Sequence, residues 1–317
     1  MTVPPSVLSA AKAALEMRIG QTTSIRNAGH VGGGCINPSA RLETDGGEAF
    51  FLKWNDSAPE EMFEAEADGL DALAATRTLR VPEVLGWGGT STPTDPGWLL
   101  LEFLPRGAPG RNYGSRMGEG LALLHSSGAT HLPGDDGQPG PRRTFGWHRD
   151  NFIGSLPQTN REAESWAVFW RDMRIEPQLR LARELGHLRG QDGQVLDRLL
   201  SHMEDILPHD GGQGPALLHG DLWSGNYYPD SSGAPVIIDP ATYRGDGEVD
   251  LAMMELFGSL PSGFTEAYST VRSLPGEYAA FRRDLYQLYY LLAHVNIFGR
   301  SYLAGSLAAA RRVLAAT

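Results

Sequence analysis

The sequence contains a single cysteine, Cys35, so no disulfide bond can form within the chain. It also lacks an apolar run approaching the roughly 18 residues that a membrane-spanning helix needs. Its first twenty residues have no basic segment followed by a continuous apolar stretch, which a secretory signal requires. These absences favour a reducing compartment, and we expect the cytoplasm.

Basic residues are scarce as well. The chain of 317 residues has 27 Lys and Arg against 38 Asp and Glu, which gives a formal net charge of −11. Surfaces that bind nucleic acid or anionic membranes need clustered Lys and Arg, so we expect neither partner. Hydrophobic residues make up 41% of the chain, which is typical of a globular protein with a core.

The pattern of residues 1–106 predicts a small β-rich lobe with one main helix. The expected elements are a helix in the first twenty residues, strands at 40–43 and 49–54, a helix over 58–76, and a strand pair at 80–89 and 97–107. Asp45-Gly46 is a hairpin signal between the first two strands. The last strand ends in a polar segment that we interpret as a hinge.

Residues 107–317 predict a larger, mostly helical lobe. Apolar residues recur at helical spacing from Met117 to Leu124, over 162–174, and in two helices near the end of the chain. Pro177 is expected to begin a new helix. Residues 128–160 are rich in Gly, Pro and charge and are too long for an ordinary connection. We expect that segment to be either mobile or functional.

Polar residues follow two short apolar runs in this second lobe. "LLHGDLWSGN" contains Asp221 and Asn226, and "PVIIDPA" ends in Asp239. Phosphoryl transfer needs an aligned nucleophile and neutralised phosphate charge, and Mg²⁺ takes oxygen ligands. The runs match in order the H-R-D-x-x-x-x-N and D-F-G segments of protein kinases. They predict an ATP site in an α+β, protein-kinase-like bilobal fold.

A structural explanation competes with that hypothesis, because Asp and Asn are common in exposed turns after strands. Either motif alone leaves the two explanations evenly balanced. Their occurrence together and in order favours the kinase site. His219 is expected to brace the loop by hydrogen bonding, and Asp250 to cap a helix or anchor the loop. His125 and His294, judged from the sequence pattern alone, are expected to be structural.

The first lobe offers groups for the ATP phosphates and for adenine. Lys53 ends a predicted strand, and Glu66 on the next helix is its preferred partner over Glu64. Glu102 and Leu104 in the hinge are expected to bind adenine through their backbone. The remaining candidates are the glycines Gly32, Gly33 and Gly34, whose amides can approach phosphate closely. Taken alone, that glycine signal is weak.

At these motifs the sequence resembles the fructosamine kinase family, also called ketosamine-3-kinases, within the aminoglycoside phosphotransferase-like kinases. The resemblance runs across nearly the whole chain and includes "FFLKWN", "FGWHRDNFIGSLPQTN", "HGDLWSGN" and "HVNIFG". It implies a kinase that uses ATP and Mg²⁺ to phosphorylate the 3-hydroxyl of a ketosamine. The amine would be a small molecule or a protein lysine, and the product would lose its sugar spontaneously.

The resemblance also implies roles for individual residues. Asp221 would be the base, Asn226 and Asp239 would be the Mg²⁺ ligands, and Lys53 would bind phosphate. Trp223 would form a wall of the sugar pocket. His294, in "HVNIFG", becomes a second candidate for contact with the substrate.

Other interpretations remain open at this point. A kinase of the same fold could act on an aminoglycoside, choline or a sugar, and a nucleotide-binding protein without turnover would keep the same pocket. Cys35 lies among the phosphate-loop glycines, so we expect either a monomer or a redox-linked dimer through this thiol. An inert cysteine that fills a turn is an equal alternative.

Overall fold

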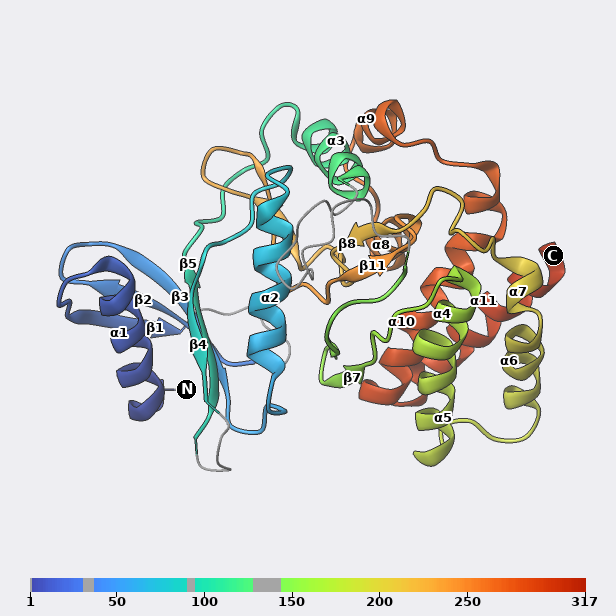
Figure 1. Ribbon diagram of the computed structural model, residues 1–317, viewed down its shortest axis with the longest axis horizontal. Helices are drawn as coiled ribbons and strands as arrows, with labels where there is room; N and C mark the ends of the chain where they lie inside the picture. Colours follow the sequence, from blue (N-terminus) through green and yellow to red (C-terminus); the bar gives the residue numbers. More distant parts are fainter. Residues whose placement is uncertain (1, 31–36, 90–94, 128–143) are drawn as a thin grey trace.

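The computed structural model describes residues 2–30, 37–89, 95–127 and 144–317. Its first lobe is built on one antiparallel sheet (Figure 1). The strands are β1 (Ile25–His30), β2 (Ser39–Thr44), β3 (Ala49–Asn55), β4 (Val84–Gly88) and β5 (Gly97–Glu102), in the order β1-β2-β3-β5-β4. The predicted hairpin between β2 and β3 is confirmed, with Ser39 paired to Lys53.

Two helices cover opposite faces of this sheet (Figure 1). Helix α1 (Pro5–Ile19) packs against β4 and β5 from the outside. It begins with Pro5, whose missing amide hydrogen costs nothing at a first helical position, and ends at Gly20, which has a φ of 71°. Helix α2 (Met62–Ala75) lies on the other face, between the sheet and the second lobe.

The second lobe is mostly helical, as predicted. Its helices are α3 (Tyr113–Ser126), α4 (Trp166–Phe169), α5 (Glu176–Glu184), α6 (Gln191–Ser201), α7 (Met203–Ile206), α8 (Glu248–Leu256), α9 (Phe264–Val271), α10 (Arg283–Phe298) and α11 (Leu303–Ala316), with π-helical turns at Trp170–Ile175 and Tyr278–Arg282 and a 3₁₀ turn at Arg300–Tyr302. No helix in the described ranges is long and apolar enough to cross a membrane.

In the described part of the second lobe, three short strand pairs accompany the helices. They are β6 (Asn151–Ile153) with β7 (Leu156–Gln158), β8 (Ala216–Leu218) with β11 (Tyr243–Gly245), and β9 (Tyr227–Pro229) with β10 (Pro235–Ile237). The first pair lies inside the segment 128–160, for which no regular structure was expected. Strands of three residues are too short to produce a visible alternation of polar and apolar residues.

Pro177 lies in the first turn of α5, as expected, but no gap separates α5 from the helical turn before it. The chain is helical without a break from α4 through the π-helical turn into α5. Proline has no amide hydrogen and its ring collides with the carbonyl four residues earlier in a regular α-helix. A wider π turn directly before Pro177 changes the hydrogen-bond register at that point, so the helix continues.

The buried side chains form two clusters. The larger one joins α2 and β5 to the helices of the second lobe. The smaller one lies between α1 and the outer face of the sheet and includes Val7, Ala11 and Leu15. Because α2 belongs to the larger cluster, the inner face of the first lobe shares its core with the second lobe. The boundary between residues 106 and 107 stays a prediction.

Leu15→Ala should destabilise the protein without affecting the pocket described below. Leu15 is completely buried in the smaller cluster, and such a truncation costs about 2–5 kcal/mol. We expect a lower Tm in a thermal melt and unchanged nucleotide affinity. Met17→Ala on the same helix is the control, since Met17 is 85% exposed. Equal losses in both variants would contradict the packing of α1.

Candidate active site

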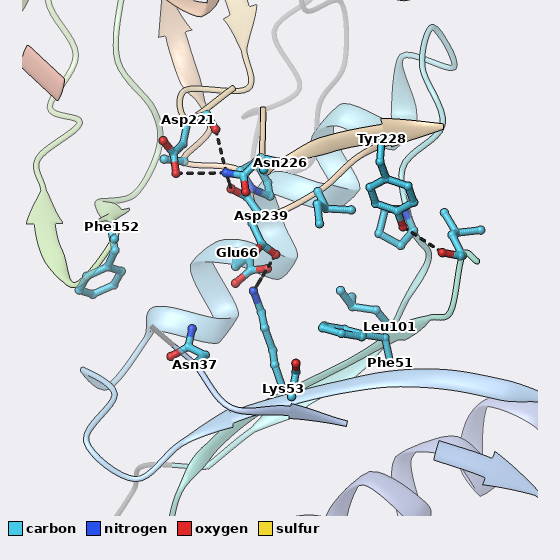
Figure 2. Close-up of a pocket in the computed structure, with 18 of the residues that line it drawn as sticks. Asn37, Phe51, Lys53, Glu66, Leu101, Phe152, Asp221, Asn226, Tyr228 and Asp239 are labelled. Atoms are coloured by element: carbon cyan, nitrogen blue, oxygen red, sulfur yellow. Dashed lines mark hydrogen bonds and ion pairs between the residues drawn. The ribbon is translucent and has the colours of Figure 1, made fainter. Parts of the chain in front are cut away.

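A cavity of about 460 Å³ lies between the two lobes. Figure 2 shows residues of both lobes converging on it. Its lining includes Asn37, Ser39, Phe51, Lys53, Glu66, Leu101, Glu102, Leu104 and Arg106 from the first lobe and the hinge, and Asn151, Phe152, Asp221, Trp223, Asn226, Tyr228 and Asp239 from the second. Most of the candidate residues that the structure describes therefore face one space.

Lys53 connects three segments of the chain at this cavity. Strand β3 directs its ammonium toward α2, where it forms an ion pair with Glu66. Its Nζ also lies 3.0 Å from Asp239 Oδ1. Burial lowers the pKa of Lys53, but Asp239 and Glu66 outweigh that effect and raise it to about 12. The pairing predicted for Glu66 is confirmed, because Glu64 contacts Arg149 instead.

Asp239 has an uncommon backbone conformation. Its φ is 55°, in the left-handed region that Asp tolerates better than most residues. This turn ends the apolar run of β10 and directs the carboxylate into the cavity beside Lys53. The Asp239 side chain is 42% exposed, so it is open to a ligand. Non-glycine residues in this region carry strain that often accompanies function.

Asp221 and Asn226 line the cavity from the second lobe, next to Asp239. The Asn226 side-chain amide donates to the Asp221 backbone carbonyl at 2.8 Å and to its carboxylate at 3.2 Å. It also lies 3.4 Å from the Asp239 carbonyl. Burial, with Asp239 nearby, raises the pKa of Asp221 well above its usual range. The three side chains predicted to act together therefore occupy one place.

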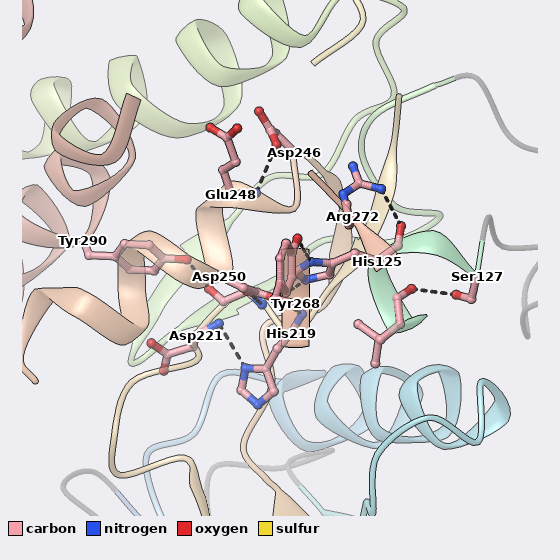
Figure 3. A network of polar contacts seen from close by, with 12 residues as sticks. His125, Ser127, His219, Asp221, Asp246, Glu248, Asp250, Tyr268, Arg272 and Tyr290 are labelled. Carbon is pink, nitrogen blue, oxygen red and sulfur yellow. Dashed lines mark hydrogen bonds and ion pairs between the residues drawn. The ribbon is translucent and has the colours of Figure 1, made fainter. Parts of the chain in front are cut away.

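The loop that carries Asp221 is held by a buried carboxylate (Figure 3). Asp250 accepts the backbone N–H groups of His219 and Gly220, both at 2.8 Å. The Nε2 of His125 lies 3.1 Å from the same carboxylate, and Tyr268 meets the other ring nitrogen at 2.9 Å. The structural role expected for His125 is confirmed, and Asp250 anchors the loop.

His219 braces the same loop from within, as predicted. Burial lowers the pKa of His219, which favours the neutral ring. In that form Nε2 donates to the Ile238 carbonyl at 2.8 Å, and Nδ1 accepts the Asp221 N–H at 3.2 Å. Gly220 must be glycine, because its φ is 82° and a Cβ there would lie 2.1 Å from the Ala241 carbonyl oxygen.

Two aromatic side chains lie near Asp221. Trp223 lines the cavity as predicted, and its ring covers Gly225 so closely that a Cβ on that glycine would lie 2.3 Å from it. Phe152 lines the cavity from the β6–β7 hairpin (Figure 2). Phe152 was not predicted individually. Its segment, "FIGSLPQTN", was singled out only as a whole.

His294 is not among the residues that line the cavity. Its Nδ1 lies 2.8 Å from the Tyr290 carbonyl, and its ring packs 4.9 Å from both Phe257 and Tyr302 and 5.4 Å from Phe298. The structure thus agrees with the structural expectation for His294 and gives no contact between it and the cavity.

The hinge residues line the cavity, but their predicted adenine contacts stay predictions. The Glu102 carboxylate is bound by Arg80 and by the Glu83 N–H at 3.2 Å. Its side chain therefore serves these contacts and not nucleotide binding. The Leu104 carbonyl accepts the Tyr228 hydroxyl at 3.1 Å. The glycine candidates Gly32, Gly33 and Gly34, with Cys35, lie outside the described residues.

Comparison with known proteins agrees with this geometry. The family model for fructosamine kinase matches residues 7–316. A probable ketoamine kinase from Synechocystis is 41% identical over 283 residues, which cover 89% of this chain and 88% of that protein. A chloroplastic protein-ribulosamine 3-kinase from Arabidopsis thaliana is 37% identical over 291 residues, covering 91% and 82%.

Solved structures agree as well. A crystal structure from Haemophilus somnus with the provisional name fructosamine-3-kinase matches with a TM-score of 0.82 and 27% identity over 98% of both chains. The aminoglycoside phosphotransferase APH(4)-Ia shares the fold, with a TM-score of 0.58 and 16% identity over 96% of this chain and all of the other.

The bilobal fold and the pocket between its lobes define a protein-kinase-like phosphotransferase. Within that class, the chain belongs to the fructosamine kinase family.

Asp221→Asn should stabilise the metal-free and nucleotide-free protein at neutral pH. Below the unfolded pKa of about 3.9, Asp221 is protonated in both states and costs nothing. As the pH rises toward the raised folded pKa, the unfolded state ionises more readily, so the wild type loses stability that the Asn variant keeps.

Thermal melts between about pH 5 and pH 8 would measure this effect. The Tm difference between Asp221→Asn and wild type should be positive and should grow with pH. Asp56→Asn, which changes an exposed acid, is the control and should show little difference at any pH. A Tm difference for Asp221→Asn that shrinks with pH would contradict the raised pKa.

Proposed function

We propose that this protein is an ATP-dependent kinase that phosphorylates the 3-hydroxyl of ketosamines. The observation that carries the proposal is the convergence of the Lys53–Glu66 pair with Asp221, Asn226 and Asp239 in one cavity. Membership of the fructosamine kinase family supplies the acceptor class. An aminoglycoside, choline or an unmodified sugar is not favoured as acceptor.

Asp221 would act on the acceptor hydroxyl. Its carboxylate would orient the hydroxyl and accept the proton as the oxygen bonds to the γ-phosphorus and the bond to the β–γ bridging oxygen breaks. The products are ADP and the sugar phosphate. The raised pKa of Asp221 makes it a better proton acceptor than an ordinary carboxylate. Bound cations would partly offset that shift.

The opposite end of the cavity would take the nucleotide. Lys53, held by Glu66, would bind the phosphates, and the Glu102 carbonyl with the Leu104 amide would bind adenine. The glycines Gly32, Gly33 and Gly34 would cover the phosphates with their backbone amides. These assignments follow the kinase pattern along the chain.

The donors present fit Mg²⁺. Among the described residues no group of three or more His, Cys, Asp and Glu side chains is arranged as a metal site, whereas an amide with one or two carboxylates suits Mg²⁺ completed by phosphates. Asn226 and Asp239 would hold the ion. Bound there, it would neutralise charge on the phosphates. Repulsion from Asp239 contributes to the raised pKa of Asp221, and added positive charge would relieve it.

Trp223 and Phe152 would enclose the sugar on either side of Asp221. A ketosamine carries a carbonyl at C2, so a phosphate on C3 lies beside an enolisable centre. Enolisation toward C1 expels the phosphate from C3, and water then hydrolyses the remaining carbon–nitrogen bond to give free amine and a dicarbonyl sugar. The kinase step is therefore sufficient for deglycation. Protein-bound ketosamines are included, since one relative is named for ribulosamines on proteins.

The expected location and assembly state stay predictions. The single cysteine, Cys35, was the reason to expect the cytoplasm, and it is also the residue of the suggested redox-linked dimer. Comparing the oligomeric state and activity of the native chain and of Cys35→Ala with and without reductant would test the dimer.

Turnover of ATP should depend on a ketosamine acceptor and on Asp221. We expect ADP release with free and protein-bound ribulosamine and fructosamine, and none above background with kanamycin, choline or glucose. Asp221→Asn should lower kcat about 10²- to 10⁴-fold and leave ADP affinity nearly unchanged. Nucleotide binding with no transfer to any acceptor would instead support a binding protein without turnover.

Chelation of divalent cations should abolish turnover, and Mg²⁺ should restore it. Asp239→Asn should raise the Mg²⁺ concentration needed for half-maximal rate, because it removes a carboxylate from the ion's site. Titration of ADP affinity against Mg²⁺ gives a readout independent of turnover. An ADP affinity that responds equally to Mg²⁺ in wild type and in Asp239→Asn would contradict the assignment.

A further inference from the structure

The acidic face of α2 contacts a short segment of the second lobe, Trp147-His148-Arg149. Asp68 accepts the Trp147 indole N–H at 2.7 Å through one carboxylate oxygen, and His148 Nε2 lies 3.1 Å from the other oxygen. One turn earlier, Glu64 lies 3.1 Å from Arg149. We call the segment 147–149 and its two acidic partners the interlobe clamp.

We infer that the interlobe clamp holds α2 in the position at which Glu66 meets Lys53, so that Asp68 is a positioning residue for phosphoryl transfer. This inference rests on the proposed function. In the proposed reaction Lys53 binds phosphate, and its ammonium is oriented by Glu66. Any displacement of α2 would therefore reach the nucleotide through that ion pair.

The geometry of a helix connects the clamp to Glu66. Residues 64 and 68 are four apart and share one face, while Glu66 lies between them in the chain and points to the opposite face of the helix. A single rigid turn thus carries both clamp acids and the partner of Lys53. Gly69, on the next position, is so close to the second lobe that a Cβ would lie 2.8 Å from Thr242 Oγ1. Thr242 follows Asp239 by three residues, so α2 contacts the segment that supplies the other Lys53 partner.

The second-lobe side of the clamp is firmly fixed. The backbone N–H of Trp147 donates to the Asn160 carbonyl at 2.8 Å, and the backbone N–H of Gly146 donates to the Arg244 carbonyl at 2.9 Å. The Arg244 guanidinium lies 4.8 Å from the centre of the Trp147 ring. Arg244 belongs to β11, which pairs with β8, the strand that leads into the Asp221 loop. The β8–β11 strand pair therefore supports both the clamp and the loop that carries Asp221.

The clamp differs from an ordinary surface ion pair. Exposed pairs contribute little, and a further contact, between Arg149 and the exposed Glu61 at 3.7 Å, is of that kind. The Asp68 side chain is only 16% exposed and accepts a directional hydrogen bond from the Trp147 indole N–H, with His148 Nε2 close to its other oxygen. These contacts attract α2 to the segment 147–149 and also fix its orientation, which a positioning role requires.

Asp68→Ala should lower kcat by up to about 100-fold, because a displacement near 1 Å of a group remote from the chemistry can cost that much. The KM for the ketosamine should be unchanged, since Asp68 does not line the cavity. Asp71→Ala, which removes an exposed acid from the next turn of α2, is the matched control. It should keep the wild-type kcat.

A double-mutant cycle separates positioning from general weakening. If Asp68 acts through Glu66, adding Asp68→Ala to Glu66→Gln should change kcat by no more than about twofold, the usual error of additivity. The same factor in both backgrounds would overturn the inference. The charge exchange Glu64→Arg with Arg149→Glu should recover activity lost in either single variant, and failure to recover would count against the clamp.

Hydrogen exchange in α2 tests the clamp without turnover. Amides in residues 62–75 of the full chain should exchange faster in Asp68→Ala than in wild type, and Asp71→Ala should match wild type. If no ketosamine is phosphorylated, the proposed function fails while this comparison still tests the clamp. Equal exchange in Asp68→Ala and wild type would overturn the inference.

Discussion

The buried ammonium of Lys53 is the interaction on which the arrangement of the site depends. It binds Glu66 on α2 and Asp239 at the end of β10, so it joins the sheet, its inner helix and the second lobe. Desolvation lowers the pKa of this lysine, and the two carboxylates outweigh that effect, so the ammonium stays charged. Lys53 is thus paired with two acids, whereas burial and the nearby Asp239 disfavour the ionised form of Asp221.

This environment of Asp221 is maintained by hydrogen bonds that hold its loop in place. Asp250 receives two backbone N–H groups of the loop, and Tyr290 donates to the Gly220 carbonyl at 2.7 Å. These bonds hold Asp221 where burial disfavours its ionised form. An unrestrained carboxylate would move toward solvent to avoid desolvation. The hydrogen bonds from α8 and α10 prevent this movement and offset the cost of burying Asp221. Strain of this kind at a functional site is common, and the surrounding fold has to over-determine it.

The sequence was sufficient for the groups that act through residue type and spacing. Asp221, Asn226 and Asp239 were found because each follows a short apolar run, and Glu66 because helical spacing places it beside the packed face of α2. The position of Phe152 could not be predicted, since three-residue strands leave no periodic signal and the hairpin is held by distant groups such as Thr242, whose carbonyl accepts from Asn151 at 2.8 Å. Pro177 was placed at the start of a helical segment, but the π turn that joins this segment to α4 without a gap leaves no signal in the sequence.

The bond between Tyr228 and the Leu104 carbonyl has a consequence for the shape of the pocket. Tyr228 lies two residues after Asn226, a span of about 7 Å in extended chain. The proposed adenine end and the proposed phosphate end are therefore joined by one short strand, which is fastened at both of its ends. The fixed length of this strand sets the distance between the two ends of the cavity. A nucleotide that binds there must match this distance, because the strand cannot lengthen.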